Sequence, residues 1–338
     1  MPDPPVLASA GADAAAATYK VVDLGVLAGG VNSSGEAINA NGDVVGWSET
    51  AAGIHPVMWR GSRMRDLGLP FGTDAYATGI SDDRTVVGYA AKGLAERRAF
   101  VWKQGVFTLV AVRSRDIAFN AINNGGVVVG GYRFAGTSSA VHALRWTAAG
   151  GVVDLHPAGY AASGAFGISE NGTVAGWARL ANGTRATHAA QWSPANVFTD
   201  LGTLSPGSNS WANDVNDAGR VVAVDDGGGQ GLLSFVWCCS TQVKKLGTGA
   251  ANGISPLGRI VGIQDGTANP NGSLRAATRR NAGAPWQLLP QLGAAGKRTS
   301  FGFAVNACGT MAGWSEVGSG AAPLPYHAVR WAISTCDK

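Results

Sequence analysis

The sequence feature that most constrains the fold is a hairpin pattern that recurs along the chain. Its first copy, "GEAINANGDVVGWSE" (35–49), has a small residue, Ile or Val, and Asn or Ser, then a polar turn, then Val-Val-Gly and an aromatic residue. A polar turn between two apolar runs predicts a β-hairpin. Seven copies, 39 to 51 residues apart, share the apolar anchor: Ile38, Ile80, Ile122, Ile168, Val215, Ile254 and Val305. This period is typical of four-stranded propeller blades.

Two further strand patterns follow most of the hairpins. The third strand ends in Trp, as in "HPVMW" and "HAVRW", except that the sixth copy has Arg279 there, and the fourth ends near "DLG". The last copy lacks its fourth strand, whereas an extra segment, "YKVVDLG" (19–25), precedes the first hairpin. A closed ring removes the open ends of stacked sheets. We therefore expect an all-β, seven-bladed β-propeller of four-stranded antiparallel blades, with the N-terminal strand closing the last blade.

The composition is consistent with one large β-domain. The chain has 338 residues, of which 50 are Gly, and no apolar run reaches the length of a transmembrane helix. We expect a flexible segment at 1–18, a single propeller domain at 19–338, and a monomer. The net charge of +4 comes without a basic stripe, which argues against nucleic-acid binding. The Ala-rich start is typical of what remains around a cleaved export signal.

The combination of "AIN..G.VVG" with "HA..W..G....DLG" resembles the HAF-repeat family of extracellular bacterial proteins. The resemblance covers Tyr19 to Trp331. It implies a secreted or periplasmic protein at the exterior of a bacterial cell. It brings no shared activity and no catalytic residue.

The four cysteines lie in the last third of the chain, and none has the Cys/His spacing of a zinc site. We therefore expect neither a metal nor a cofactor. Cys308, in the last hairpin turn, and Cys336, after the last Trp strand, fall at the same end of the ring. A Cys308–Cys336 disulfide is expected, in keeping with an oxidising compartment. For Cys238 and Cys239, a vicinal disulfide and two free thiols both stay open.

Four histidines hold one repeat position ahead of the strand Trp: His55, His142, His188 and His327. A residue that recurs around a ring indicates a repeated hydrogen bond or packing contact. His156, in "DLHPAG", lies off this position. A Ser/His/Asp catalytic arrangement cannot be assembled from it.

The long, variable loops precede the first strand of each copy or join its second and third strands, so they emerge at one end of the ring, here the long-loop face. The other end, the tight-turn face, carries turns such as "NANG" and "SENG". Binding residues concentrate on variable loops held by a rigid scaffold, so we expect the site on the long-loop face over the central channel. The candidate ligand-binding residues are aromatic (Trp211, Tyr76, Phe119), polar (Asn120, Asn213, Asp214, Asn252) and basic (Arg113, Arg115).

These residue types favour a secreted binding protein whose partner is a glycan or a surface protein, because aromatic faces stack on sugars and Arg pairs with anions. A polysaccharide hydrolase or lyase at the same channel mouth is the alternative, and whether the protein is an enzyme stays open. A glycosidase needs two carboxylates about 5 to 9.5 Å apart. The catalytic candidates are Glu36, Asp214 and Asp116, although the first and fifth copies lie far apart on a ring. A water-filled channel without a ligand would also explain the polar residues.

Overall fold

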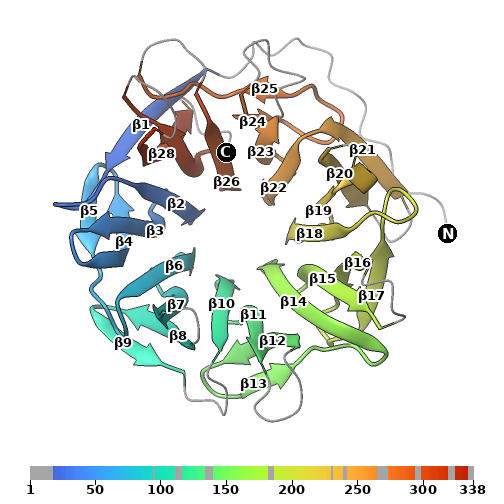
Figure 1. The fold of residues 1–338 in the computed structure, drawn as a ribbon. Coiled ribbons are helices and arrows are strands. Elements are labelled where there is room, and N and C mark those ends of the chain that lie inside the picture. The colour runs from blue at the N-terminus through green and yellow to red at the C-terminus, as the bar shows by residue number, and fades with distance from the viewer. Residues whose placement is uncertain are drawn as a thin grey trace.

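A computed structural model describes residues 18–93, 96–110, 116–133, 140–181, 186–229, 231–238, 242–264, 273–293, 298–318 and 324–333. Apart from one short 3-10 turn, η1 (Gly227–Gly229), the regular secondary structure of these residues consists of β-strands. The strands lie in sheets around a central opening (Figure 1). The all-β prediction is confirmed, whereas residues 1–17 of the predicted flexible segment lie outside the described residues. Within the same ranges, no helix is long and apolar enough to cross a membrane.

The strands follow the repeat in order. The first copy supplies β2 (Ser33–Ile38), β3 (Val44–Thr50), β4 (Gly53–Arg60) and β5 (Arg63–Asp66), and the second β6 (Asp74–Ile80), β7 (Val86–Lys92), β8 (Glu96–Lys103) and β9 (Val106–Leu109). The third supplies β10 (Ile117–Ile122), β11 (Val128–Arg133), β12 (Val141–Thr147) and β13 (Gly151–Asp154), and the fourth β14 (Tyr160–Ile168), β15 (Val174–Leu180), β16 (Thr187–Trp192) and β17 (Phe198–Gly202). The fifth supplies β18 (Ser210–Val215), β19 (Val221–Asp225), β20 (Leu233–Cys238) and β21 (Gln242–Thr248), and the sixth β22 (Ala250–Ile254), β23 (Ile260–Gln264), β24 (Arg275–Arg279) and β25 (Gln287–Leu288). The seventh supplies β26 (Ser300–Val305), β27 (Met311–Glu316) and β28 (Tyr326–Ile333), and β1 (Tyr19–Gly25) precedes them all.

Each copy forms antiparallel strand pairs, with its first strand nearest the central opening (Figure 1). The third to sixth copies each form a separate four-stranded sheet. The first two copies belong to one eight-stranded sheet, because Ile54 of β4 pairs in parallel with Asp74 of β6. The sheets are the blades of a β-propeller built from a repeated unit.

The N-terminal strand joins the C-terminal sheet, as the sequence predicts. β1 pairs antiparallel with β28 in the order β1-β28-β27-β26, with Tyr19 opposite Ile333. On the tight-turn face, the amide of Asn306 donates to the carbonyl of Asn39 at 3.0 Å. The last copy therefore contacts the first through side chains as well as through β1.

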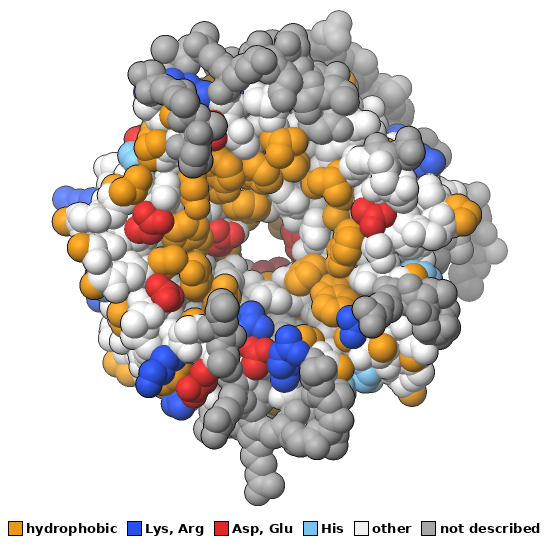
Figure 2. Space-filling model, viewed as in Figure 1, with side chains coloured by type: hydrophobic (Ala, Val, Ile, Leu, Met, Phe, Trp, Pro, Cys, Tyr) orange, Lys and Arg blue, Asp and Glu red, His pale blue; other side chains and the backbone are white. Residues whose placement is uncertain are grey.

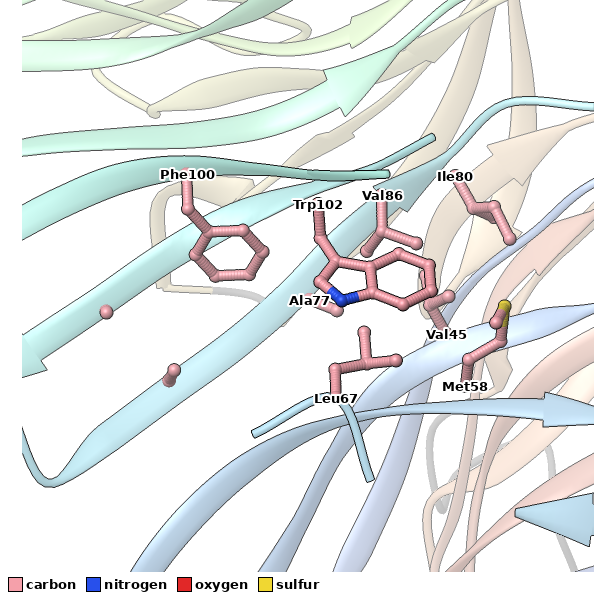
Figure 3. Close-up of a cluster of buried hydrophobic side chains, with 10 residues drawn as sticks. Val45, Met58, Leu67, Ala77, Ile80, Val86, Phe100 and Trp102 are labelled. Atoms are coloured by element: carbon pink, nitrogen blue, oxygen red, sulfur yellow. The ribbon is translucent and has the colours of Figure 1, made fainter. Parts of the chain in front are cut away.

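The faces of neighbouring sheets pack on each other through apolar side chains. Between the first two copies, Val45 and Met58 lie in one buried cluster with Val86 and Trp102 (Figure 3). Trp102 is 2% exposed, and Val45 and Val86 are fully buried. A single sheet could not cover these side chains alone, which is the physical reason for the repeat.

The Trp at the end of the third strand also bonds to the neighbouring copy. The indole nitrogens of Trp59, Trp192 and Trp331 donate to backbone carbonyls 35 to 41 residues earlier in the chain, at 2.6 to 2.8 Å. In the sixth copy, the Arg279 guanidinium donates instead to the carbonyl of Leu246 at 2.8 Å. The indole of Trp286 donates to the same carbonyl at 3.0 Å, so Arg279 and Trp286 together replace the third-strand Trp. Arg279 is 8% exposed and has no carboxylate partner among the described residues.

The repeated histidines make the repeated hydrogen bond that the sequence predicts. Nδ1 of each lies 2.9 to 3.0 Å from the carboxylate of the "DLG" aspartate, in the pairs His55–Asp66, His142–Asp154, His188–Asp200 and His327–Asp23. The last pair joins β28 to β1. His156 stands where other copies have the "DLG" glycine, and its ring stacks on His142 with centroids 3.9 Å apart.

Candidate functional site

Each first strand carries a β-bulge near the channel. In every pairing with the second strand the register shifts at the same repeat position. The residues at the shift are Glu36, Thr78, Asn120, Phe166, Asn213, Asn252 and Phe303. A bulge leaves one residue unpaired and re-aims its side chain, so these residues are positioned differently from the rest of the strand.

Four of the bulge residues tie neighbouring first strands together. The hydroxyl of Thr78 and the amides of Asn120, Asn213 and Asn252 each donate to the backbone carbonyl just before the next bulge, at 2.7 to 2.9 Å. The three asparagines were expected to bind ligand, but each amide donates a hydrogen bond to the next strand instead. Their observed role is to hold the inner strands of the ring together.

Glu36 has the same position but breaks this ladder, because an ionised carboxylate cannot donate a hydrogen bond. It instead accepts one from the indole of Trp47, at 3.0 Å. Burial raises the pKa of the Glu36 carboxyl above its usual value, and the hydrogen bonds from the Ser34 hydroxyl and the Trp47 indole only partly offset this. No Lys, Arg or His of the described ranges forms an ion pair with Glu36. A buried carboxylate without a cation is costly.

Glu36 lies beside a continuous series of aromatic rings, here called the aromatic band. Its members, in order of contact, are Tyr89, Tyr76, Trp47, Tyr326, Trp314, Phe301 and Phe303. Successive ring centroids lie 4.7 to 6.2 Å apart, and every member is half-buried. Figure 2 shows hydrophobic side chains gathered around the central opening. The band spans the second, first and seventh copies.

Negative charge borders the aromatic band. Burial raises the pKa of Tyr76 to about 12, and the nearby carboxylates of Asp74 and Glu49 contribute to that shift. Burial also raises the pKa of Tyr326, again with a contribution from Glu49 and Glu36. The one cation stacked on the band within the described residues is Arg97, 5.7 Å from the ring centre of Tyr89. The band is therefore an apolar surface in a negative field.

Of the three aromatic residues expected to bind ligand, Tyr76 belongs to the aromatic band, whereas Phe119 and Trp211 do not. Phe119 is fully buried and packs on Trp146, so its assignment as a ligand-binding residue is wrong. Trp211 is half-buried, like the band residues, but packs against the small cluster that contains Val224 and Ile263.

Of the three charged candidates on the loops, the structure describes only Asp116. Asp116 is held between Arg97 and Arg133, each with its guanidinium Nε at 2.5 Å. These bonds keep its pKa low in spite of partial burial, which does not suit a proton donor. Arg113 and Arg115 lie outside the described residues.

A cavity of about 240 Å³ opens on the tight-turn face, where only turns were expected. Its wall contains the seven apolar anchors of the repeat, and the polar lining includes Asp82, Asn124, Glu170 and Asp217. The catalytic candidate Asp214 also lines this cavity. Glu36 instead contacts Trp47 in the aromatic band, so the structure does not bring the predicted carboxylate pair together. Among the described residues, no three His, Cys, Asp or Glu side chains are placed to hold a metal ion.

Asp214 occupies a position that is Ala or Gly in the other copies. Its carboxylate accepts from the backbone N–H groups of Val215 and Ile254 at 2.8 and 2.9 Å. The neighbouring Gly167 leaves room for it, because a Cβ there would lie 2.7 Å from Oδ1. Burial nevertheless raises the pKa of Asp214 to about 6.

The Asp214→Asn variant should be more stable than the parent at neutral pH. Because the folded pKa exceeds the ordinary 3.8, the folded state holds more protons than the unfolded state between these pH values. The parent therefore loses stability as the pH rises through that window. The amide removes the charge but keeps only one of the two acceptor oxygens, and the lost hydrogen bond offsets part of the gain. We expect a net gain of about 1 kcal/mol at pH 7 and none near pH 3.5. Urea unfolding at both pH values measures this, and equal stability at pH 7 would contradict it.

Of the seven members of the aromatic band, only Tyr76 was among the residues expected to bind ligand. Trp47, Tyr89 and Trp314 are the aromatic residue of the Val-Val-Gly-aromatic motif, and Tyr326 begins the last strand. The third, fifth and sixth copies have Gly131, Val224 and Ile263 at that position. The clustering of the motif aromatics in adjacent copies was the available signal.

Comparison with known proteins supports the fold and leaves the family open. No protein-family model and no curated protein sequence matches the chain. Virginiamycin B lyase from Staphylococcus aureus is similar in structure, with a TM-score of 0.57 and 12% identity over 94% of this chain and 100% of that chain. A streptogramin B lyase gives 0.60 and 10% identity over 94% and 98%. YCF48 bound to D1 peptide gives 0.51 and 10% identity over 94% and 97%. These likenesses show a shared propeller-like fold.

Proposed function

We propose that this chain is a binding protein that recognises an extracellular glycan with the aromatic band. The observation that carries the proposal is the unbroken contact of seven half-buried rings beside the channel. Stacked and edge-on rings present apolar faces of the size of sugar rings, and Tyr hydroxyls and carboxylates at their edges can bond sugar hydroxyls. A rigid set of aromatic side chains gives contact area at low cost in conformational entropy.

Catalysis has less support in the geometry. A glycosidase requires two facing carboxylates, but Glu36 lies beside the aromatic band and Asp214 lines the cavity of the tight-turn face. Asp116 is neutralised by two arginines. Binding without turnover therefore accounts for the arrangement with fewer requirements.

A glycan-array screen tests the proposal. The parent, Tyr326→Ala and Phe107→Ala are compared, because Phe107 is a half-buried aromatic residue on an outer strand away from the band. We expect the parent and Phe107→Ala to bind the same glycans and Tyr326→Ala to lose them. If the parent binds no glycan, the partner is of another class and the proposal fails. If all three proteins bind equally, the site lies elsewhere.

The proposal also covers the number of blades, the family and the location of the protein. The two halves of the eight-stranded sheet count as separate blades, which gives a seven-bladed ring. The chain is assigned to the HAF-repeat family and to the bacterial exterior, secreted or periplasmic, on the strength of its motifs. The expected Cys308–Cys336 disulfide agrees with export to an oxidising compartment.

The Cys308–Cys336 disulfide stays a prediction, because Cys336 lies outside the described residues, as does Cys239. We expect peptide mass analysis without reduction to find Cys308 and Cys336 linked. Reduction should lower the free energy of unfolding by about 3 kcal/mol, because a closed loop of this size is released in the unfolded chain. Unlinked cysteines in protein secreted into an oxidising compartment would remove the disulfide from the account.

A further inference from the structure

Stacking of a glycan on the aromatic rings does not explain why a carboxylate occupies the position of Glu36. The ladder position takes Thr or Asn in four copies, and each of those side chains bonds the next strand. A carboxylate there gives up that bond and must be desolvated. Its hydrogen-bond donors are the Trp47 indole, at 3.0 Å, and the Ser34 hydroxyl, and both are neutral. The structure thus holds a half-buried carboxyl group that forms no ion pair with a cation of the described chain.

The surroundings of Glu36 suit a cation supplied from outside. The faces of electron-rich rings attract cations, most strongly where water is excluded. Burial and the neighbouring carboxylates, including Glu36, raise the pKa of Tyr326 and of Tyr89, although Arg97 at the far end of the band opposes this for Tyr89. Glu49 adds negative charge but is engaged by the backbone and side chain of Asn32 at 3.0 Å. Glu36 is therefore the carboxylate best placed to meet a ligand charge.

We propose that the sugar unit seated on the aromatic band carries a protonated amino group that pairs with Glu36. The ligand class is then a glycan of amino sugars with free amines. The ring of the sugar stacks on the aromatic faces, and its ammonium group donates a charge-assisted hydrogen bond to the Glu36 carboxylate. This inference rests on the proposed function, because it names the chemistry of the same site. It also gives a reason for the loss of the ladder bond at this one polar position.

A matched ligand series tests the inference. Hexamers of β-1,4-linked glucosamine, N-acetylglucosamine and glucose differ only in the substituent at C2, and each is titrated calorimetrically in buffer that protonates the free amine. The parent should bind the glucosamine hexamer about tenfold or more tightly than the other two. Glu36→Gln removes the charge but keeps an acceptor for Trp47, and its amide can donate as the ladder asparagines do. We expect this variant to fold and to lose most of the preference for the free amine.

Asp217→Asn is the matched control, since it removes one carboxylate from the tight-turn face. It should keep the preference of the parent within about twofold, whereas a general effect of net charge would lower it as much as Glu36→Gln does. Equal binding of the three hexamers by the parent would overturn the inference and leave glycan binding in place. A preference that survives in Glu36→Gln would also overturn it. Failure of all hexamers to bind overturns it too, and the array screen then decides separately whether any glycan is recognised.

Discussion

Replacing Trp59 with alanine should lower the free energy of unfolding by about 3–5 kcal/mol. Trp59 is fully buried in a cluster with Leu24 of β1, Val44 of β3 and Ala328 of β28. Its indole nitrogen also donates to the carbonyl of Leu24 at 2.8 Å. The substitution therefore opens a cavity and leaves a buried carbonyl without its donor at the contact between β1, the first copy and the last.

Trp59→Phe separates the two contributions. It keeps most of the apolar contact and removes only the hydrogen bond, so we expect a loss of about 1–2 kcal/mol. Both losses are measured by equilibrium unfolding in urea. If Trp59→Ala unfolds with the parent's free energy, the β1 contact does not stabilise the ring, and the closure of the propeller needs another explanation.

Replacing Trp47 with alanine should weaken glycan binding at least tenfold, or about 1.4 kcal/mol. Trp47 contacts Tyr76 and Tyr326 with ring centroids 6.0 Å away in both cases. It also orients Glu36 through its indole nitrogen. Its loss divides the aromatic band in two and frees the carboxylate, so both stacking and polar recognition suffer.

The affinity is measured by calorimetry with a glycan found in the array screen. Phe107→Ala serves as the control for loss of an aromatic side chain, and it should bind within about twofold of the parent because it lies outside the band. Trp47→Phe, which keeps a ring but removes the donor to Glu36, should be intermediate. Full affinity in Trp47→Ala would exclude the aromatic band as the binding surface.

The repeat made much of the fold predictable because the residues that recur lie at the interfaces between neighbouring copies. Recurring strand positions keep the same neighbour in several copies: the third-strand Trp bonds to the preceding copy in three of them, and the His meets the "DLG" aspartate in four. The last copy lacks its fourth strand, so the repeat assigns "YKVVDLG" to the last sheet, and β1 indeed pairs with β28. Even the exception at Arg279 keeps the function of the residue it replaces, since it donates to the carbonyl of Leu246.

The site was harder to predict because it depends on bulges, which shift the side-chain alternation by one residue. Phe119 directly precedes a bulge, in register with Ala77, Ala165 and Ala212, and all four are fully buried. Tyr76 lies one residue earlier relative to its bulge and belongs to the aromatic band. Aligning Phe119 on these alanines would have identified it as a core residue from the sequence alone.

The partners of the inner polar residues were not visible in the sequence either. The sequence does not show whether the amide of an asparagine at the channel mouth faces a ligand or the next strand. Only the spacing of neighbouring first strands shows that Asn120 and Asn252 reach a backbone carbonyl at 2.7 and 2.9 Å. The cavity on the tight-turn face likewise arises from how the copies meet, which no single repeat encodes.

The central claim is that ligand is bound by the aromatic band on the long-loop face. Hydrogen–deuterium exchange of the parent, with and without a glycan from the array screen, tests it directly. The account predicts that ligand slows exchange in β3, β6 and β27 and at the start of β28, and leaves the turns that contain Asp82, Glu170 and Asp217 unchanged. Slower exchange in those turns, with no change along the band, would place the site in the cavity of the tight-turn face and contradict the account.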